Sequence, residues 1–443
     1  MRAAVRTVLQ ADSSPDHITP YDRFSWSDTT VEAWLASGER REELVDYFGA
    51  AEYRVLSGLA ARARRRPRVD PAFTVVVVPG IMGSQLGFKR PAPLPDDVLW
   101  IDPIDMQRGR LRQLHLEGAG RIVPLGAVLF SYMRLKLLLR AHGLATELYD
   151  YDWRHPVVEL GAALAEHLER HKATRLALVA HSMGGLVARA ALGARGLAKV
   201  TRVILIATPN LGSYSAVQAL RGTDAVVRKL ARLTPTDSAE SLTGEVYSTF
   251  PSLYDLLPPG NGRLDLLDAT AWPPGGPQPR AGLLARSRLD RARLAPADAR
   301  FATVSGTGQP TVTAIARRGA DFVYTLTRSG DGTVPVSSSI LPGAPGFFAR
   351  AAHSELTRDP QVAAAVAELL RRGTTNRLPR RYASASRARA QVSDARLRRT
   401  QVEKVDWAAL SAAARREFLQ NLNEPLGLAL RAPPRRLRQK RAR

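Results

Sequence analysis

Four short apolar runs, separated by helical patterns, limit the folds that this chain of 443 residues can adopt. The runs are TVVVVP (74–79), LALVAH (176–181), RVILIA (202–207) and FATVSG (301–306). They are apolar throughout rather than at alternate positions, which is typical of parallel strands that helices cover on both faces. The segment VVELGAALAEHLERH (157–171) repeats apolar residues at helical spacing and carries charges on its other face. The sequence therefore predicts an α/β fold with a mostly parallel sheet and helices on both faces.

The second run leads directly into a candidate nucleophile. Ser182 lies in AHSMG (180–184), between the LALVAH run and an Ala- and Leu-rich segment with a helical pattern. A strand, a tight turn around a serine and a helix form the nucleophile elbow of α/β-hydrolases, usually written GxSxG. Ala180 and Gly184 occupy its two small positions, which let the strand and the helix approach each other. The alternative is that Ser182 only caps the helix that follows it.

The acid and the base of such a site should follow the serine, because α/β-hydrolases use the chain order Ser, Asp or Glu, His. His353 is the only histidine after residue 181, so it is the candidate base. Asp331 lies between glycines in SGDGTVP (329–335), where a rigid turn can present a carboxylate to an imidazole; a plain Asx-turn is the alternative. His181 adjoins Ser182, and a sharp turn sends neighbouring side chains apart. We therefore expect His181 to be structural.

Two backbone amides are candidates for stabilising negative charge on a substrate oxygen. Met183 follows the serine at the start of the predicted helix, where N–H groups are free and the helix dipole favours an anion. Pro79 and Gly80 turn the chain after the first run, so that the amide of Ile81 can point toward Ser182. A plain turn at the end of a strand is the alternative for this second segment.

Eight segments together resemble the lecithin:cholesterol acyltransferase family, which includes a lysosomal phospholipase branch and bacterial members. In the family's order between residues 74 and 353, they are VVVVPGIMGSQL, LWIDP, YDYDWR, AHSMGG, ATPNLGS, FPSLYDLLP, SGTGQPT and SGDGTVP. AHSMGG occurs in many lipases, whereas YDWR and DGTVP at these separations are more specific. The chain departs from the secreted members in having no cysteine to tie down a lid.

The resemblance implies an α/β-hydrolase fold with a cap, and it assigns roles to individual residues. It implies Ser182 as nucleophile, Asp331 as acid and His353 as base, with Ile81 and Met183 as oxyanion amides. It also implies that Trp100 lies near the mouth of an acyl-binding cleft, for which a place in the core is the alternative. For YDWR, Trp153 is a large apolar anchor and Arg154 a five-donor fork that can hold a carboxylate, so we expect both to serve the scaffold.

Composition along the chain indicates three parts. Residues 1–70 form an N-terminal extension that is expected to be partly helical, and residues 71–370 form the α/β-hydrolase domain. A Pro- and Gly-rich stretch at about 214–300 is expected to be a cap inserted over the sheet. Residues 371–443 hold 20 Lys and Arg against 5 Asp and Glu, an excess of +15 within a net charge of +23. We expect a basic, partly disordered tail, and we expect deletion of residues 375–443 to leave ester cleavage intact.

Location and partners are expectations from charge and hydropathy. No apolar stretch reaches the roughly 18 to 20 residues that span a bilayer, and the first 17 residues lack the apolar core of a secretory signal. The expected location is cytoplasmic. The terminal RRLRQKRAR (435–443) can attract an anionic membrane surface, which would make the protein peripheral to a membrane; nucleic acid is the less favoured partner.

The three candidate residues predict a serine-dependent enzyme that works through an acyl-enzyme intermediate. The family resemblance implies that this enzyme is an O-acyltransferase or lipase acting on lipid acyl esters. The predicted chemistry needs no metal and no organic cofactor. One alternative is an esterase of the same fold that acts on non-lipid esters. The other is a non-catalytic α/β module that binds membranes or nucleic acid through its basic tail.

Overall fold

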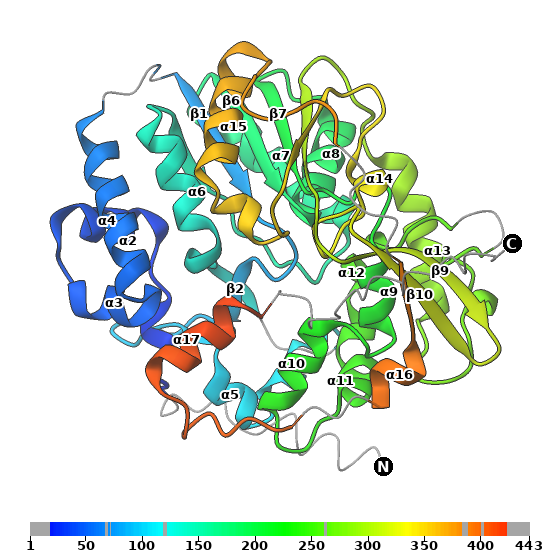
Figure 1. Ribbon diagram of the computed structural model, residues 1–443. Helices are drawn as coiled ribbons and strands as arrows, with labels where there is room; N and C mark the ends of the chain where they lie inside the picture. Colours follow the sequence, from blue (N-terminus) through cyan, green and yellow to red (C-terminus); the bar gives the residue numbers. More distant parts are fainter. Residues whose placement is uncertain are drawn as a thin grey trace, which may run out of the picture.

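A six-stranded parallel sheet forms the centre of the protein (Figure 1). The computed structural model describes residues 18–66, 70, 72–117, 122–260, 264–382, 389–399 and 403–422. The sheet has the order β11-β8-β7-β6-β1-β5, and each neighbouring pair is parallel. Its strands are β1 (Phe73–Val78), β5 (Ala145–Leu148), β6 (Arg175–His181), β7 (Val200–Ile206), β8 (Phe301–Gly306) and β11 (Gly346–Ala349). The four predicted runs correspond to β1, β6, β7 and β8, while the two edge strands, each of four residues, gave no comparable signal.

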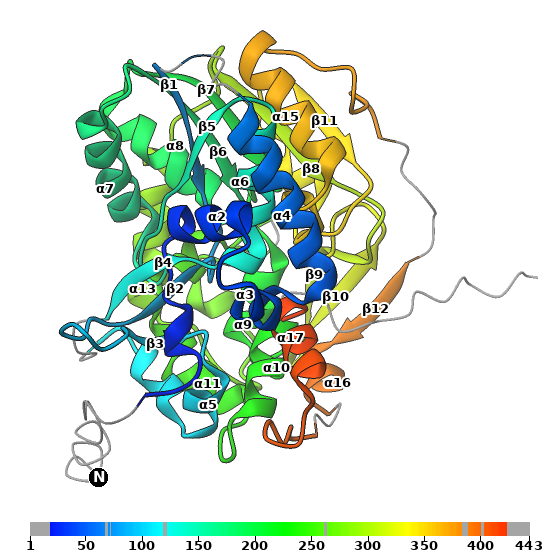
Figure 2. The same ribbon diagram turned by 90° about the vertical axis from the view of Figure 1, so that its left-hand side faces the viewer.

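Helices cover both faces of this sheet. The four main ones are α6 (Leu129–Ala141), α7 (Val157–Arg170), α8 (Met183–Arg195) and α15 (Pro360–Arg372). Successive side chains of a strand point to opposite faces. Accordingly Val75 and Val77 pack with residues of α6 and α15, and Val76 and Val78 with residues of α7 and α8. In Figure 2 the sheet lies between α7 and α8 on one side and α6 and α15 on the other. This arrangement is the predicted α/β-hydrolase fold.

Helix α8 approaches α7 closely enough to need a glycine at the contact. The apolar residues of α7, among them Leu160, Leu164 and Leu168, are buried at helical spacing, as its sequence pattern predicts. A Cβ at Gly161 would lie 2.4 Å from the Cβ of Ala190, so no larger residue fits there without a shift. The close packing fixes α8, the helix that begins directly after Ser182.

In its described residues the N-terminal extension has three α-helices that form an outer layer on α6. They are α2 (Asp28–Ser37), α3 (Arg41–Phe48) and α4 (Ala50–Arg65), and their apolar residues share a core cluster with Leu129, Met133 and Leu137. Lys136 of α6 is only 2% exposed, and its Nζ pairs with Asp28 at 2.8 Å and Glu32 at 3.1 Å. The extension is thus packed onto the domain.

Between β7 and β8 the chain forms a group of helices, in the range expected for a cap. The α-helices are α9 (Tyr214–Leu220), α10 (Ala225–Leu233), α11 (Ala239–Glu245), α12 (Pro251–Asp255) and α13 (Ala281–Asp290), with the 3₁₀ turn η3 (Tyr247–Thr249) among them. Within 214–260 and 264–300 no strand occurs. This group of helices is called the cap below.

Two small antiparallel sheets flank the main one. One has the order β3-β2-β4, with β2 (Ser84–Phe88), β3 (Asp97–Trp100) and β4 (Val123–Ala127). The other has the order β12-β10-β9, with β9 (Thr311–Arg318), β10 (Asp321–Thr327) and β12 (Ala390–Ser393). Because β12 comes from the basic C-terminal region, that region is part of a sheet.

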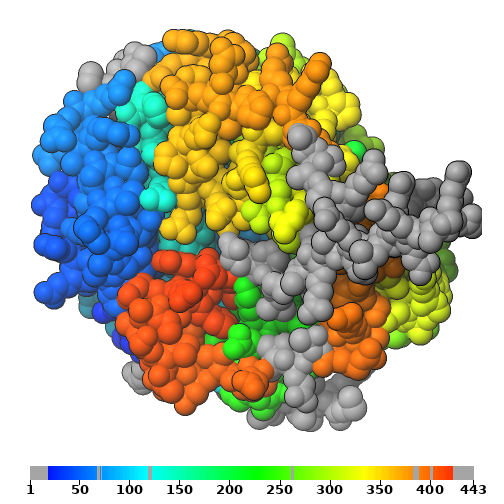
Figure 3. Space-filling view, viewed as in Figure 1, coloured from blue at the N-terminus to red at the C-terminus, as the bar shows by residue number. Residues whose placement is uncertain are grey.

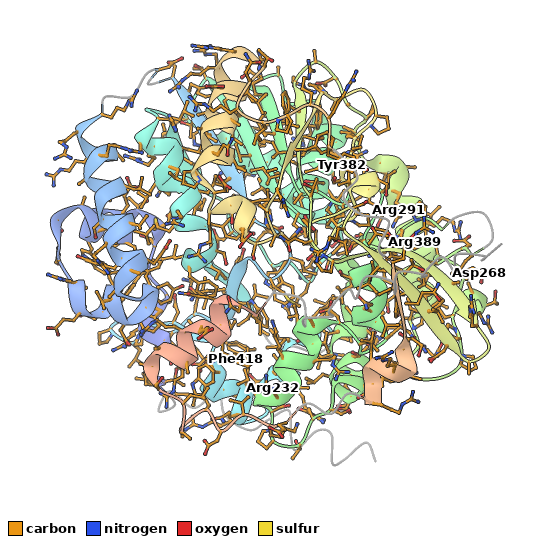
Figure 4. All side chains as sticks on the ribbon, viewed as in Figure 1. Arg232, Asp268, Arg291, Tyr382, Arg389 and Phe418 are labelled. Atoms are coloured by element: carbon orange, nitrogen blue, oxygen red, sulfur yellow. The ribbon has the colours of Figure 1, made fainter. Side chains whose placement is uncertain are left out.

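Beyond residue 388 the described C-terminal residues are 389–399 and 403–422, which continue from β12 into α16 (Asp394–Arg399) and α17 (Ala412–Gln420). Lys404 Nζ donates to the carbonyl oxygens of Ala231, Thr234 and Asp237, which end and follow α10. Arg232 of α10 lies 5.9 Å from the ring centroid of Phe418 on α17, and both are labelled in Figure 4. Figure 3 shows α17 on the surface between the N-terminal helices and the cap.

This packing differs from the predicted basic, partly disordered tail. The sequence suggested a tail because the region is basic and poor in strand signals, but its cations bond to carbonyl oxygens and carboxylates of the domain and of the N-terminal extension. We therefore no longer expect that ester cleavage survives removal of residues 375–443. The terminal RRLRQKRAR lies outside the described residues. None of the helices in the described ranges combines the length and apolarity needed to cross a membrane.

Candidate active site

Ser182 occupies a strained turn between β6 and α8. Its φ of 54° and ψ of −129° lie in a region that non-glycine residues rarely adopt. The backbone around it permits this conformation: its N–H donates to the carbonyl of Ile206 at 2.8 Å. A Cβ at Gly184 would lie 2.3 Å from the carbonyl oxygen of Pro79, and one at Gly80 would lie 2.9 Å from Ser182 Cβ. Glycines at both positions therefore let β1, the serine turn and α8 approach each other.

The serine side chain does not cap the helix. Ser182 occupies the N-cap position of α8, yet its hydroxyl forms no capping hydrogen bond. It is 7% exposed, and it lines a cavity of about 380 Å³. The simple capping role, which the sequence left open, is therefore not the role of this hydroxyl.

Asp331 and His353 form a hydrogen-bonded pair beside the same cavity. His353 Nδ1 lies 2.8 Å from Asp331 Oδ2, and the His353 backbone N–H donates to the Asp331 carbonyl at 2.9 Å. Asp331 Oδ1 accepts the N–H groups of Thr333 at 2.9 Å and Val334 at 2.6 Å. Both interpretations of Asp331 thus hold at once, since one oxygen makes the Asx-turn and the other faces the histidine. An Nδ1–H that donates to Asp331 leaves Nε2 of His353 as the proton acceptor.

The cavity brings the predicted serine, aspartate and histidine together. Ser182, Asp331 and His353 line it, together with Ile81. Among the described residues no direct hydrogen bond joins Ser182 to His353, which is common for catalytic pairs before substrate binds. The histidine comes from the loop after β11, the aspartate from the loop after β10, and the serine from the end of β6.

The two predicted oxyanion amides lie next to this serine. Met183 is the first residue of α8, so its N–H is one of the four at the helix start without an intrahelical acceptor. Ile81 lines the cavity in the turn that Gly83 closes by donating to Gly80 O at 3.0 Å. Within the described chain no acceptor takes the Ile81 N–H. The assignment of these two amides as an oxyanion hole stays a prediction.

A tyrosine that sequence reasoning missed connects the two turns of the site. The Tyr132 hydroxyl of α6 accepts the Gly80 N–H at 2.8 Å and lies 3.0 Å from His181 Nδ1. His181 Nε2 in turn lies 3.2 Å from the carbonyl oxygen of His353. Burial, with the nearby His353, holds the pKa of His181 well below its usual range, so His181 is a neutral ring that donates through Nε2. No local pattern marks Tyr132, because it lies on an ordinary buried helix face.

The aromatic residues singled out in the sequence serve as supports. Trp100 is 1% exposed and does not line the cavity; its indole N–H donates to Met82 O at 3.1 Å, which holds the Ile81 turn from behind. Its ring packs edge-on against Trp153 at 5.4 Å. The structure therefore places Trp100 in the core, the alternative that the sequence left open, rather than at a cleft mouth. In that position its ring is buried and its indole N–H has a hydrogen-bond acceptor.

The YDWR segment is likewise structural in its contacts. Trp153 donates from its indole to Ser84 O at 3.0 Å. Arg154 pairs with Asp152 through Nε at 2.9 Å and Nη2 at 2.6 Å, and donates to Leu114 O at 2.9 Å. The expected carboxylate partner of Arg154 is thus Asp152, two residues earlier.

Comparisons with known proteins give a family match over part of the chain. Residues 147–233, from the end of β5 to the end of α10, match the PGAP1-like alpha/beta domain family. No curated protein matches the chain. None of these findings identifies the chain with the lecithin:cholesterol acyltransferase family, so that resemblance stays a prediction.

Solved structures with similar folds share low identity with this chain. The mature lipase BlEst2 of Bacillus licheniformis is 17% identical, with 70% of this chain and 95% of that chain covered and a TM-score of 0.36. The Tle4 and Tli4 complex gives 15% identity, coverage of 67% and 98%, and a TM-score of 0.40. The metagenomic carboxyl esterase MGS0156 is 15% identical, with 68% of this chain and 75% of that chain covered and a TM-score of 0.33. At these scores the likenesses carry no argument about chemistry.

Proposed function

We propose that the protein is a serine hydrolase that acts on lipid acyl esters through an acyl-enzyme intermediate. The observation that carries the proposal is the set of three side chains around one cavity. Ser182 lies in a strained elbow with its hydroxyl free of the helix, and the hydrogen-bonded pair of Asp331 and His353 lines the same space. This combination is the requirement for an activated serine nucleophile.

In the proposed mechanism His353 Nε2 removes the proton from Ser182 Oγ as this oxygen attacks the ester carbonyl. The Asp331 carboxylate holds the imidazole in the required tautomer and stabilises the imidazolium that forms. The amides of Ile81 and Met183 donate to the oxyanion, and each such donor typically lowers the barrier by roughly 3–4 kcal/mol. The tetrahedral intermediate then collapses, and His353 returns its proton to the leaving alkoxide. Water or an alcohol attacks the acyl-enzyme by the same route in reverse.

The cavity walls support a lipid acyl chain as the substrate. Most of the larger aliphatic side chains that line the cavity come from the cap, from β9 and β10 with the turn that follows, and from α16: Val226, Val227, Leu253, Leu256, Val312, Leu326, Val334 and Leu397. A predominantly apolar pocket with a few polar groups is typical of small-molecule sites, and burial of a methylene group contributes about 0.8 kcal/mol. Acyl esters of increasing chain length should therefore show a rising kcat/KM until the cavity is filled.

The test of the proposed function is covalent labelling by a fluorophosphonate probe, followed by ester cleavage. Wild-type protein should be labelled and should cleave p-nitrophenyl octanoate, and Ser182→Ala should do neither while keeping its circular dichroism spectrum. Asp331→Asn should remain folded and lose about 10³–10⁴-fold in kcat through the wrong His353 tautomer. An unlabelled wild-type protein would instead support the non-catalytic binding module.

A finer proposal, based on the family resemblance, is that an alcohol can replace water as acyl acceptor. The acyl-enzyme is the same for both outcomes, so transfer requires only that the cavity hold an apolar alcohol beside His353 and exclude water. Product analysis with a labelled acyl donor over a range of long-chain alcohol concentrations separates the two. Free fatty acid as the sole product throughout would leave the protein a hydrolase, and equal rates for short non-lipid esters would favour the non-lipid esterase.

A further inference from the structure

Polar side chains of the cap line one wall of the cavity beside apolar ones. The hydroxyls of Ser215 and Thr223 already donate to the carbonyl oxygens of Thr333 and Gln218, which leaves three further polar side chains to explain. They are Gln218 of α9, Asp224 at the N-cap of α10 and Tyr247 of η3. None of them comes from the sheet loops that supply Ser182 and His353. The mechanism proposed above therefore uses none of the three, and their position on the substrate cavity needs a separate explanation.

Tyr247 is the most informative of the three. It is fully buried, at 0% exposure, and its hydroxyl has no hydrogen-bond partner among the described residues. Burial raises the pKa of this phenol well above its usual range, and the negative charge of Asp224 raises it further. The hydroxyl thus stays protonated and lies within electrostatic reach of the Asp224 carboxylate. A buried hydroxyl without a partner destabilises a folded protein, and this one belongs to a residue that lines the substrate cavity, so a polar group of a ligand can complete it.

The side chains of Gln218 and Asp224, which line the same cavity, also keep hydrogen-bonding capacity. Asp224 uses Oδ1 to accept the Val226 N–H at 2.8 Å, and burial raises the pKa of its carboxyl group. The Gln218 side-chain amide has no partner within the described residues, although its backbone carbonyl accepts from Thr223. The cap wall therefore offers donors from Gln218 and Tyr247 and acceptors from all three.

We propose that Gln218, Asp224 and Tyr247 form a subsite for an aliphatic hydroxyl group of the substrate. The inference rests on the proposed function, because it names a substrate feature of the same cavity. A hydroxyl both donates and accepts, which matches this mixed set, whereas an ammonium group only donates. Lys229 lies close enough to Asp224 to lower the pKa of its carboxyl group, and the whole chain carries a net charge of +23, which further disfavours a cation.

The hydroxyl can come from either side of the ester bond. A glycerol or sugar ester carries it on the alcohol, and a hydroxylated fatty acid carries it on the acyl chain. Three ligands with eight-carbon acyl chains separate these possibilities, each compared with methyl octanoate. 1-Octanoylglycerol carries hydroxyl groups on the alcohol, methyl 8-hydroxyoctanoate carries one on the acyl chain, and octanoylcholine tests a cationic group instead.

The first experiment measures binding of these ligands to the full-length Ser182→Ala protein by ligand-observed NMR titration. Because no ester is cleaved in this protein, the result does not depend on the proposed chemistry, which the fluorophosphonate probe reports separately. At least one hydroxylated ester should bind about fivefold to tenfold more tightly than methyl octanoate, as expected for one or two net hydrogen bonds. The additional change Tyr247→Phe should remove most of this preference.

Tyr254→Phe is the matched control. Tyr254 is also a buried cap tyrosine, but its hydroxyl donates to Ser248 O at 2.8 Å and accepts the Arg280 N–H at 2.9 Å, and it does not line the cavity. Its loss should leave the preference for the hydroxylated ester unchanged. Gln218→Leu is a second test on an independent helix and should also reduce the preference.

The outcomes are distinct. A preference that falls in Tyr247→Phe and Gln218→Leu but not in Tyr254→Phe supports the subsite, and the ligand that shows it identifies the source of the hydroxyl. Equal binding of all four ligands to the Ser182→Ala protein overturns the proposal. So does a preference for octanoylcholine, or a preference for a hydroxylated ester that survives Tyr247→Phe.

Discussion

Asp394→Ala should destabilise the protein strongly, because it leaves a buried arginine without its counter-ion. Asp394 begins α16, and both it and Arg221 of the cap are 0% exposed. Asp394 Oδ2 accepts from Arg221 Nε at 2.9 Å, and Oδ1 accepts from the Tyr324 hydroxyl at 2.5 Å. The substitution therefore removes a charge partner and a hydrogen-bond acceptor from a fully buried site.

The expected loss is about 3–5 kcal/mol, the usual cost of removing one partner of a buried ion pair. This is a large share of the roughly 5–15 kcal/mol by which folded domains are stable. Urea unfolding followed by tryptophan fluorescence, with linear extrapolation to water, measures the change. Because Leu397 on the same short helix lines the cavity, KM for an octanoyl ester should rise in parallel.

Glu117→Ala is the control for this prediction. Glu117 pairs with Arg280 at 2.6 Å, but its side chain is 71% exposed, so its loss should change stability by less than about 1 kcal/mol. The reasoning fails if Asp394→Ala lies within about 1 kcal/mol of the wild-type protein. It also fails if the two variants are equally stable, since burial would then not decide the cost.

Tyr132→Phe should lower kcat roughly tenfold with little change in KM, because it removes the hydroxyl between the Gly80 N–H and His181; unchanged steady-state kinetics would refute this role. Burial raises the pKa of Asp152, but the hydrogen bonds and charges of Arg154 and His155 together outweigh it and lower this pKa from 3.8 to about 2. This group therefore stabilises the fold by about 2 kcal/mol above pH 4 and loses the effect as pH falls toward 2. Asp152→Asn should reduce the fall of the unfolding free energy between about pH 4 and pH 2. A variant whose unfolding free energy depends on pH as in the wild-type protein would contradict the lowered pKa of Asp152. Deletion of residues 423–443, which spares the described elements, should keep ester cleavage and weaken binding to anionic vesicles, and added salt should weaken the binding of the full-length protein. Vesicle binding that neither the deletion nor salt changes would refute a membrane role for this segment.

Local pattern and chain order were sufficient to predict the centre of the protein. Continuous apolar runs identify β1, β6, β7 and β8, because strands buried on both faces have no polar alternation. The serine turn is equally local, since small residues two positions on either side of Ser182 are a steric need of that turn. Asp331 and His353 follow from their order in the chain, and the structure places both beside the cavity that Ser182 lines.

Contacts between distant segments decided the rest. Arg221 and Asp394 are 173 residues apart, and neither shows in its own neighbourhood that a buried charge pair will form. Charge composition therefore indicated a tail, whereas residues 389–399 and 403–422 pack against the cap, β10 and the N-terminal helices. Trp100 and Tyr132 were likewise ambiguous, because a buried aromatic on a strand or helix has the same local pattern in a core as in a site. Only the packing of α6, β3 and the Ile81 turn assigns them, since hydrogen bonds to Met82 O and from the Gly80 N–H exist only once these segments meet.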